Sequence, residues 1–121
     1  MNGLAGSNKY RISHEFETVW LELDDRDPIV IGDFYGDPVT AIIDVDEKWC
    51  VIGGCGLIIY YLEEPFDDFA YNKISGQYRE VGRIASNIWW VQEIEQIGFL
   101  EIRITLETGE THAIEITKAG R

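Results

Sequence analysis

Residues 99–117 read FLEIRITLETGETHAIEIT and contain the clearest structural signal in the chain. Within residues 101–106 apolar side chains alternate with polar ones, which is the period of a β-strand with one buried face. Thr108 and Gly109 then turn the chain, and residues 111–117 return with the same alternation. This stretch therefore predicts an antiparallel β-hairpin.

The rest of the chain carries shorter runs of β-branched and aromatic residues that are separated by Gly, Asp and Pro, a pattern typical of strands. We expect strands at 16–23, 29–31, 39–45, 48–52 and 56–62. Of these, 39–45 and 48–52 should form a hairpin, and the nearly all-apolar run 56–62 should be buried on both faces. The sequence therefore predicts an all-β fold, an antiparallel sandwich or meander of about seven or eight strands.

Three segments depart from this pattern. Residues 65–71 permit one short helical turn, because a proline occupies its first position, within a long irregular stretch at 63–81. Residues 87–97 fit either a helix or a strand, and their alternation slightly favours a strand. Residues 1–9 are small and polar, so we expect a disordered N-terminal tail followed by a single β-rich domain at 10–121.

The chain is strongly acidic. Its 121 residues include 22 acidic and 10 basic side chains, which give a formal net charge of −12. Residues 15–47 hold 11 of the acidic residues and only one basic residue, Arg26. Such a field repels the phosphates of nucleic acid and an anionic membrane surface, so we expect neither as a partner. It favours a basic protein partner instead.

The sequence also bears on the cellular compartment. No apolar run approaches the ~18 residues of a membrane span, and the N-terminus lacks the charged and apolar regions of a secretory signal. Cys50 and Cys55 lie in apolar surroundings, so we expect buried free thiols, although a disulfide across a very short loop stays open. These features indicate a cytoplasmic protein and leave its oligomeric state open.

No motif of useful specificity for catalysis is present. A thiol nucleophile would need His14 or His112 as its base, and paired carboxylates arise by chance among so many acidic residues. We therefore expect a protein that is not an enzyme and has no cofactor or metal. The alternative is a small β-domain that binds a small ligand, or calcium through the carboxylates of residues 24–37, with hydrolytic activity as a further option.

Aromatic residues among the acidic loops predict a protein-binding surface. Residues 89 and 90 are both Trp, and in a strand they point to opposite faces, so one indole should be partly exposed. Exposed aromatic rings anchor interfaces, and carboxylates steer a basic partner. The candidate partner-binding residues are Asp24, Asp25, Asp27, Asp33, Tyr35, Asp37, Asp46, Glu47, Trp49 and Trp89.

Two segments carry a family resemblance. Residues 31–38 (IGDFYGDP) and 49–60 (WCVIGGCGLIIY) are similar to segments in small, acidic bacterial immunity proteins that accompany polymorphic and contact-dependent-inhibition toxins. The resemblance implies a stoichiometric binding protein that occludes the active site of a basic, nuclease-like toxin domain. It assigns no role to any single residue.

Overall fold

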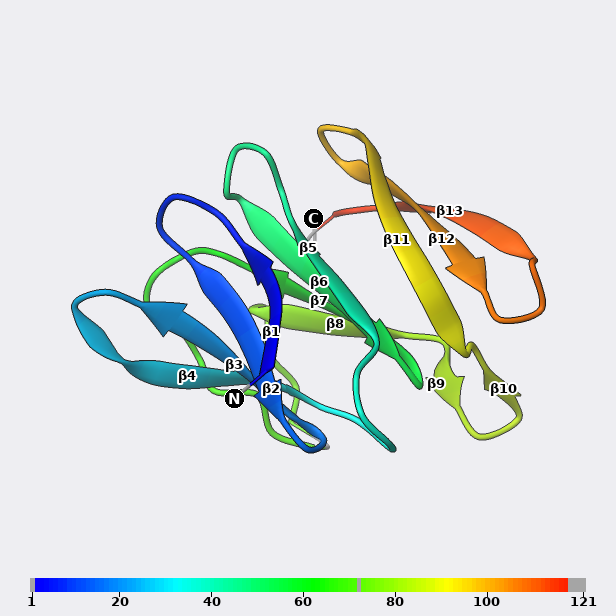
Figure 1. The fold of residues 1–121 in the computed structure, drawn as a ribbon, viewed down its shortest axis with the longest axis horizontal. Helices are drawn as coiled ribbons and strands as arrows, with labels where there is room; N and C mark the ends of the chain where they lie inside the picture. The colour runs from blue at the N-terminus through cyan, green and yellow to red at the C-terminus, as the bar shows by residue number, and fades with distance from the viewer. Residues whose placement is uncertain (1, 72, 118–121) are drawn as a thin grey trace.

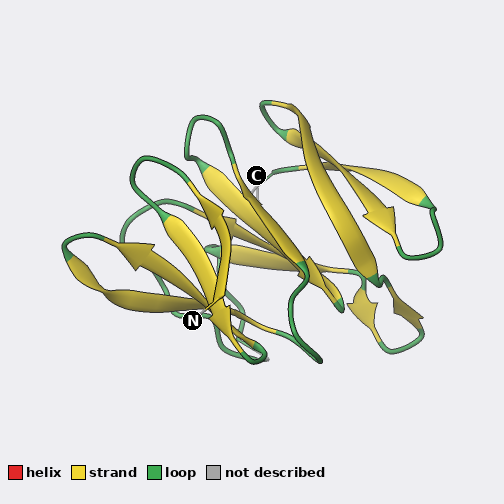
Figure 2. Cartoon of the chain, viewed as in Figure 1, coloured by secondary structure: helices red, strands yellow, loops and turns green. Residues whose placement is uncertain are grey.

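The structure is a computed structural model that describes residues 2–71 and 73–117 (Figure 1). These residues form thirteen strands in four antiparallel sheets and contain no helix (Figure 2). The described part of the chain accordingly has no helical segment that is long and apolar enough to cross a membrane. The all-β, antiparallel prediction is confirmed.

Three of the sheets are meanders, because neighbouring strands in each follow one another along the chain. The first sheet contains β1 (Asn2–Gly6), β2 (Arg11–Glu15), β3 (Thr18–Leu23) and β4 (Arg26–Asp33). The second contains β5 (Thr40–Ile43), β6 (Trp49–Gly54), β7 (Gly56–Tyr61) and β8 (Tyr78–Val81). The third contains β11 (Val91–Gly98), β12 (Glu101–Leu106) and β13 (Thr111–Glu115). The short strands β9 (Arg83–Ile84) and β10 (Asn87–Ile88) pair as a separate hairpin.

The second sheet is the middle layer of the molecule, with the first sheet on one face and the third on the other (Figure 1). Every residue of β6 and β7 is buried, and successive side chains enter different cores because side chains alternate along a strand. Those that face the first sheet are Cys50, Ile52, Ile58 and Tyr60. Those that face the third sheet are Trp49, Val51, Leu57, Ile59 and Tyr61. Two covered faces explain the near-continuous apolar run in this part of the sequence.

The hairpins that were predicted from local alternation are present. β5 pairs with β6, β12 pairs with β13 around the turn at Thr108 and Gly109, and β7 is buried on both faces, as expected for 56–62. The ambiguous segment 87–97 is extended and not helical, since it contributes β10 and most of β11.

Several expectations need correction. Residues 2–6, expected in a disordered tail, form β1, which pairs with β2 and packs the partly buried Leu4 and Ala5 against the first core. Pro28, which lies outside the expected strands 16–23 and 29–31, lies within β4, an edge strand where a residue without an N–H is tolerated. The strand number exceeds the prediction because β1, β2, β8, β9 and β10 were not expected, the last two having only 2 residues each.

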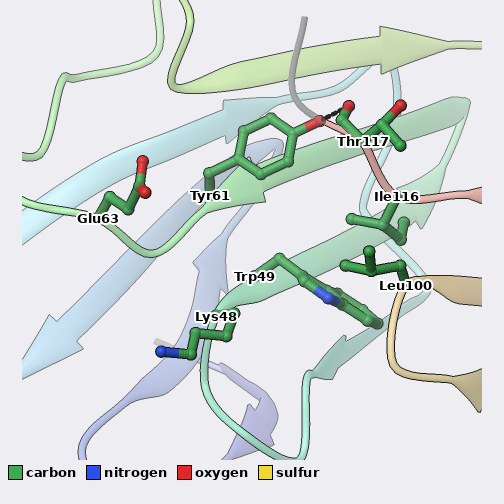
Figure 3. Close-up of a pocket in the computed structure, with 7 residues that line it drawn as sticks. All are labelled: Lys48, Trp49, Tyr61, Glu63, Leu100, Ile116 and Thr117. Carbon is green, nitrogen blue, oxygen red and sulfur yellow. Dashed lines mark hydrogen bonds between the residues drawn. The ribbon is translucent and has the colours of Figure 1, made fainter. Parts of the chain in front are cut away.

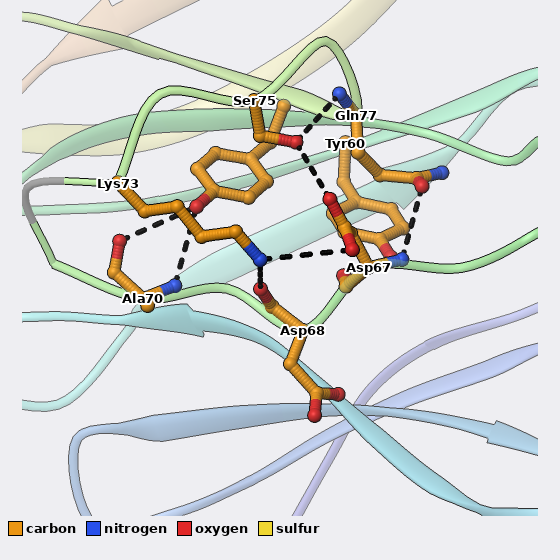
Figure 4. A network of polar contacts seen from close by, with 8 residues as sticks. Tyr60, Asp67, Asp68, Ala70, Lys73, Ser75 and Gln77 are labelled. Atoms are coloured by element: carbon orange, nitrogen blue, oxygen red, sulfur yellow. Dashed lines mark hydrogen bonds and ion pairs between the residues drawn. The ribbon is translucent and has the colours of Figure 1, made fainter.

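The helical turn expected at 65–71 is also absent, and the side chains of the loop between β7 and β8 explain why (Figure 4). The Gln77 amide donates to the carbonyl oxygens of Tyr61 (2.6 Å) and Glu63 (2.9 Å) and accepts from the backbone N–H of Asp67 (3.0 Å). The Tyr60 hydroxyl donates to the Asp67 carbonyl oxygen (2.6 Å). The bond from Tyr60 occupies the Asp67 carbonyl oxygen, an acceptor that a helical turn at 65–71 would use for itself.

Candidate functional site

The predicted partner-binding residues divide between opposite ends of the strands. Asp24 and Asp25 form the β3–β4 turn, and Asp27 lies near the start of β4. Asp33 ends β4, and Tyr35 and Asp37 follow it. Because β4 has 8 residues, its two ends lie ~25 Å apart.

Asp46 and Glu47 belong to the same end as Asp24 and Asp25. They lie in the β5–β6 turn, where the Glu47 carboxylate accepts hydrogen bonds from the Ser7 hydroxyl and from the Lys9 backbone N–H (2.9 Å). The β1–β2 turn that contains Lys9 also lines a hollow with Asp24 and Asp25. The structure therefore does not gather the acidic residues of 24–47 into one surface.

The predicted tryptophan anchors are placed differently from expectation. Trp49 is only 1% exposed in the second core, and its indole N–H donates to the Phe99 carbonyl oxygen (3.1 Å), so it is not accessible to a partner. Trp89 is half-buried and stacks on His112, with 4.4 Å between ring centroids. The exposed member of the Trp pair is Trp90, at 45%.

Tyr35 and Trp90 line the same cavity, although they are 55 positions apart in the chain. The cavity has a volume of about 310 Å³. Its walls are formed by Tyr35, Cys55, Arg83, Ala85, Ile88 and Trp90. Tyr35 is 78% exposed, which leaves most of its ring available to a partner. A predicted aromatic anchor thus meets a second exposed aromatic ring in this cavity.

Arg83 holds the elements around this cavity together. Its guanidinium donates to the carbonyl oxygens of Asp33 (2.7 Å) and Cys55 (3.4 Å) and pairs with the Glu80 carboxylate (2.9 Å). It also lies over the Phe34 ring, 4.7 Å from the centroid. The end of β4, the turn between β6 and β7, and β8 are thereby fixed to one another, and the cavity is preorganised.

A third exposed aromatic residue, Phe16, lies at the tip of the β2–β3 turn on this end of the strands. Phe16 is 78% exposed and has a φ of 53°, a conformation that is strained for a bulky side chain. Its turn is tied to the loop of Tyr35, because the Glu17 carboxylate accepts from the Gly36 N–H (2.6 Å) and the Glu17 carbonyl oxygen accepts from the Phe34 N–H (3.0 Å). Strained, exposed aromatic residues of this kind often belong to functional surfaces.

We call this region the Tyr35–Trp90 surface: the exposed rings of Phe16, Tyr35 and Trp90 with the carboxylates of Glu17, Asp33 and Asp37. Sequence reasoning missed Phe16 and Arg83 as parts of it; it expected one exposed indole at residues 89 and 90 and selected Trp89, whereas Trp90 is the exposed one. Phe16 was assigned to a strand. The one available signal for its exposure was that this aromatic residue lies where two strand-like runs meet. For Arg83 the sequence held no signal, and for the Trp pair it did not say which indole is exposed, since both depend on how three sheets stack.

A second cavity, of about 330 Å³, lies between the middle and third sheets (Figure 3). It is lined by Lys48, Trp49, Tyr61, Glu63, Leu100, Ile116 and Thr117. The Tyr61 hydroxyl donates to the Thr117 carbonyl oxygen at one side of it, and burial raises the pKa of Tyr61. This mostly apolar cavity is the observation that bears on a small-ligand function. Among the described residues, no group of three or more His, Cys, Asp or Glu side chains is arranged to hold a metal ion.

Comparisons with protein-family models, with curated proteins and with solved structures found no match to this chain.

Proposed function

We propose that this protein is a non-enzymatic binding protein that uses the Tyr35–Trp90 surface to bind a basic protein. In this proposal it acts as a bacterial immunity protein that neutralises a basic, nuclease-like toxin by covering its active site. The observation that carries the proposal is the cavity shared by Tyr35 and Trp90 beside exposed carboxylates.

The aromatic residues supply the binding energy in this proposal. Large, rigid rings bury much apolar area with little loss of side-chain freedom, so Tyr and Trp dominate the energetics of interfaces. Phe16 lies in the β2–β3 turn, Tyr35 in the connection between β4 and β5, and Trp90 between β10 and β11, and none of the three belongs to either core. Their exposed surface is therefore available to a partner.

In this proposal the exposed carboxylates steer the basic partner toward the surface. Glu17, Asp33 and Asp37 are exposed carboxylates, whereas the charge of the nearby Arg83 is paired with Glu80. This end of the molecule is therefore negative, as is the chain as a whole. A negative surface accelerates the encounter with a basic partner and makes association sensitive to salt.

A pair of charge-reversal variants tests where the partner docks. Asp33→Lys with Asp37→Lys and Asp24→Lys with Asp25→Lys change the net charge equally, but at opposite ends of the strands. If the Tyr35–Trp90 surface binds, the first variant should slow association at least about ten-fold, and the second should have a much smaller effect. Equal effects of the two variants on the association rate would contradict the assignment of the surface.

The immunity role is tested by co-expression. The product of the reading frame next to this gene is expressed in a host cell with and without this protein, and growth is measured. The wild-type protein should restore growth, and the double variant Tyr35→Ala with Trp90→Ala should not. The matched control is Tyr71→Ala with Ile74→Ala, which removes two apolar side chains that are at least as exposed as Tyr35 and Trp90, from the loop between β7 and β8. Lack of protection by the wild-type protein would argue against the role.

Small-ligand binding is the second candidate function, and the cavity beside Trp49 is the observation that favours it. A compound that fills this cavity should raise the melting temperature of the wild-type protein. The same compound should have no effect on Leu100→Trp, in which the larger side chain occupies the space. Calcium is tested in the same assay.

A further inference from the structure

We propose, on the basis of the proposed function, that the cavity between Tyr35 and Trp90 receives the guanidinium group of an arginine side chain of the partner. The volume of about 310 Å³ is at the lower limit for ligand sites, which suits one long side chain better than an extended ligand. Asp33 and Asp37, each two positions from Tyr35 in the sequence, are exposed, and the Asp33 carbonyl oxygen accepts from Arg83 of the cavity wall (2.7 Å).

The chemistry of the walls favours a cation. The faces of Tyr and Trp rings are electron-rich and attract positive charge, and Trp is the strongest of the aromatic residues in this respect. Ala85 and Ile88 provide apolar contacts for the methylene groups of a long side chain. A purely apolar side chain would fill the same space but would gain nothing from the negative charge of the exposed Asp33 and Asp37.

Arginine fits better than lysine for a geometric reason. Its guanidinium is planar and weakly hydrated, so it stacks on aromatic rings at a lower desolvation cost than an ammonium group. The protein already uses this contact twice within its own fold, since Arg83 lies over Phe34 and Arg26 lies over Phe66, the latter 5.4 Å from the ring centroid.

The positive charge of Arg83 in the cavity wall does not prevent this binding. Its ion pair with Glu80 (2.9 Å) balances that charge, and its N–H groups point to the carbonyl oxygens of Asp33 and Cys55. The exposed carboxylates of Asp33 and Asp37 are therefore left to attract the incoming cation.

The probe for this inference is N-acetyl-arginine-N-methylamide, titrated into the full protein while the indole N–H resonances of its tryptophans are followed by NMR. The Trp90 resonance is identified by its absence from Trp90→Phe. We expect it to move in a saturable way, with a dissociation constant on the order of millimolar. The lysine analogue should bind at least about three-fold more weakly, and the citrulline analogue, which has the same shape but no charge, should leave Trp90 unchanged.

Substitutions test whether the arginine probe binds in the cavity between Tyr35 and Trp90. Tyr35→Ala should weaken the arginine probe at least about five-fold, whereas Tyr71→Ala, which removes an equally exposed ring elsewhere, should not. Failure of the probe to move Trp90, or equal binding of the arginine and citrulline analogues, would overturn the inference. If the partner still depends on Tyr35 and Trp90 for binding in that case, the proposed function stands alone. If the probe binds but no partner does, the proposed function fails and the guanidinium site stands.

Discussion

The side-chain amide of Gln96 donates a hydrogen bond of 2.8 Å to the buried carboxylate of Asp44 and so links β11 in the third sheet to the turn that follows β5 in the second. The same Asp44 carboxylate accepts from the Lys48 backbone N–H (3.1 Å), and the Gln96 amide oxygen accepts from the Val45 N–H (3.2 Å). Two layers are thus joined by a polar contact as well as by apolar packing.

This contact predicts the effect of Asp44→Ala. The substitution leaves the Lys48 N–H without its acceptor and the Gln96 amide with only the Gly98 carbonyl oxygen (3.0 Å), which should lower the free energy of unfolding by about 1–3 kcal/mol. Urea denaturation measures the change. Asp46→Ala removes a carboxylate two positions away that is exposed, and we expect a change below about 0.5 kcal/mol. Similar losses in the two variants would show that the buried contact contributes little.

Substitution of two glycines with positive φ distinguishes the cost of backbone strain from the cost of steric overlap. Gly56 (φ 86°) and Gly36 (φ 80°) adopt a conformation that is costly for other residues. A Cβ atom on Gly56 would overlap the side-chain stem of Arg83 and lie 3.0 Å from the Gly82 carbonyl oxygen, whereas one on Gly36 would meet nothing within 4 Å.

We therefore expect Gly36→Ala to cost about 1 kcal/mol, from the backbone alone. Gly56→Ala should cost at least about 2 kcal/mol more, because it displaces Arg83 as well. Chemical denaturation of both variants gives the comparison. The Gly56 variant should also weaken partner binding, since Arg83 organises the cavity, and a Gly56→Ala protein with wild-type stability would contradict the overlap.

The thiols should differ in reactivity. Cys50 is fully buried, and burial raises its pKa, so the reactive thiolate is suppressed. Cys55 is a free, half-buried thiol in the wall of the Tyr35–Trp90 cavity. A thiol reagent should modify one cysteine per folded chain and both in denaturant. Cys55→Ser should abolish the reaction of the folded protein, and Cys50→Ser should leave it unchanged.

The hydrogen-bonded Glu47 carboxylate leads us to predict that the fold becomes less stable at acidic pH. Hydrogen bonds from the Ser7 hydroxyl and the Lys9 N–H lower its pKa below the ordinary value of 4.5. A carboxylate whose pKa is lower in the folded state stabilises the fold above the unfolded-state pKa, and this contribution is lost as the pH falls through the folded-state pKa. The melting temperature should therefore decrease below about pH 4.5. Glu47→Gln should show a smaller decrease with pH, and Ser7→Ala an intermediate one; identical slopes would contradict the assignment.

The features that were predictable from the sequence are those with local causes. The alternation in β12 and β13 and the apolar run of β7 record which faces are buried, and this information lies within each segment. β1 was missed because its glycines and alanine carry no strand pattern. Its order depends on pairing with β2 and on contact with the first core.

The candidate site was only partly predictable for a similar reason. Tyr35 was selected correctly as an exposed aromatic residue, but the accessibility of each tryptophan depended on the stacking of sheets. Trp49 looked available while its strand was regarded as one face of a two-layer sandwich. In the three-layer structure both faces of β6 are covered, so Trp49 is part of the core.

The exposed aromatic residues of the Tyr35–Trp90 surface sit at the tips and joints of hairpins and contribute to neither core. If this surface binds a partner as proposed, the residues that recognise the partner are separate from those that pack the fold. Phe16, Tyr35 or Trp90 could then be exchanged to follow a changing partner while the layers beneath remain intact. On this proposal, a change of specificity would carry little penalty in stability.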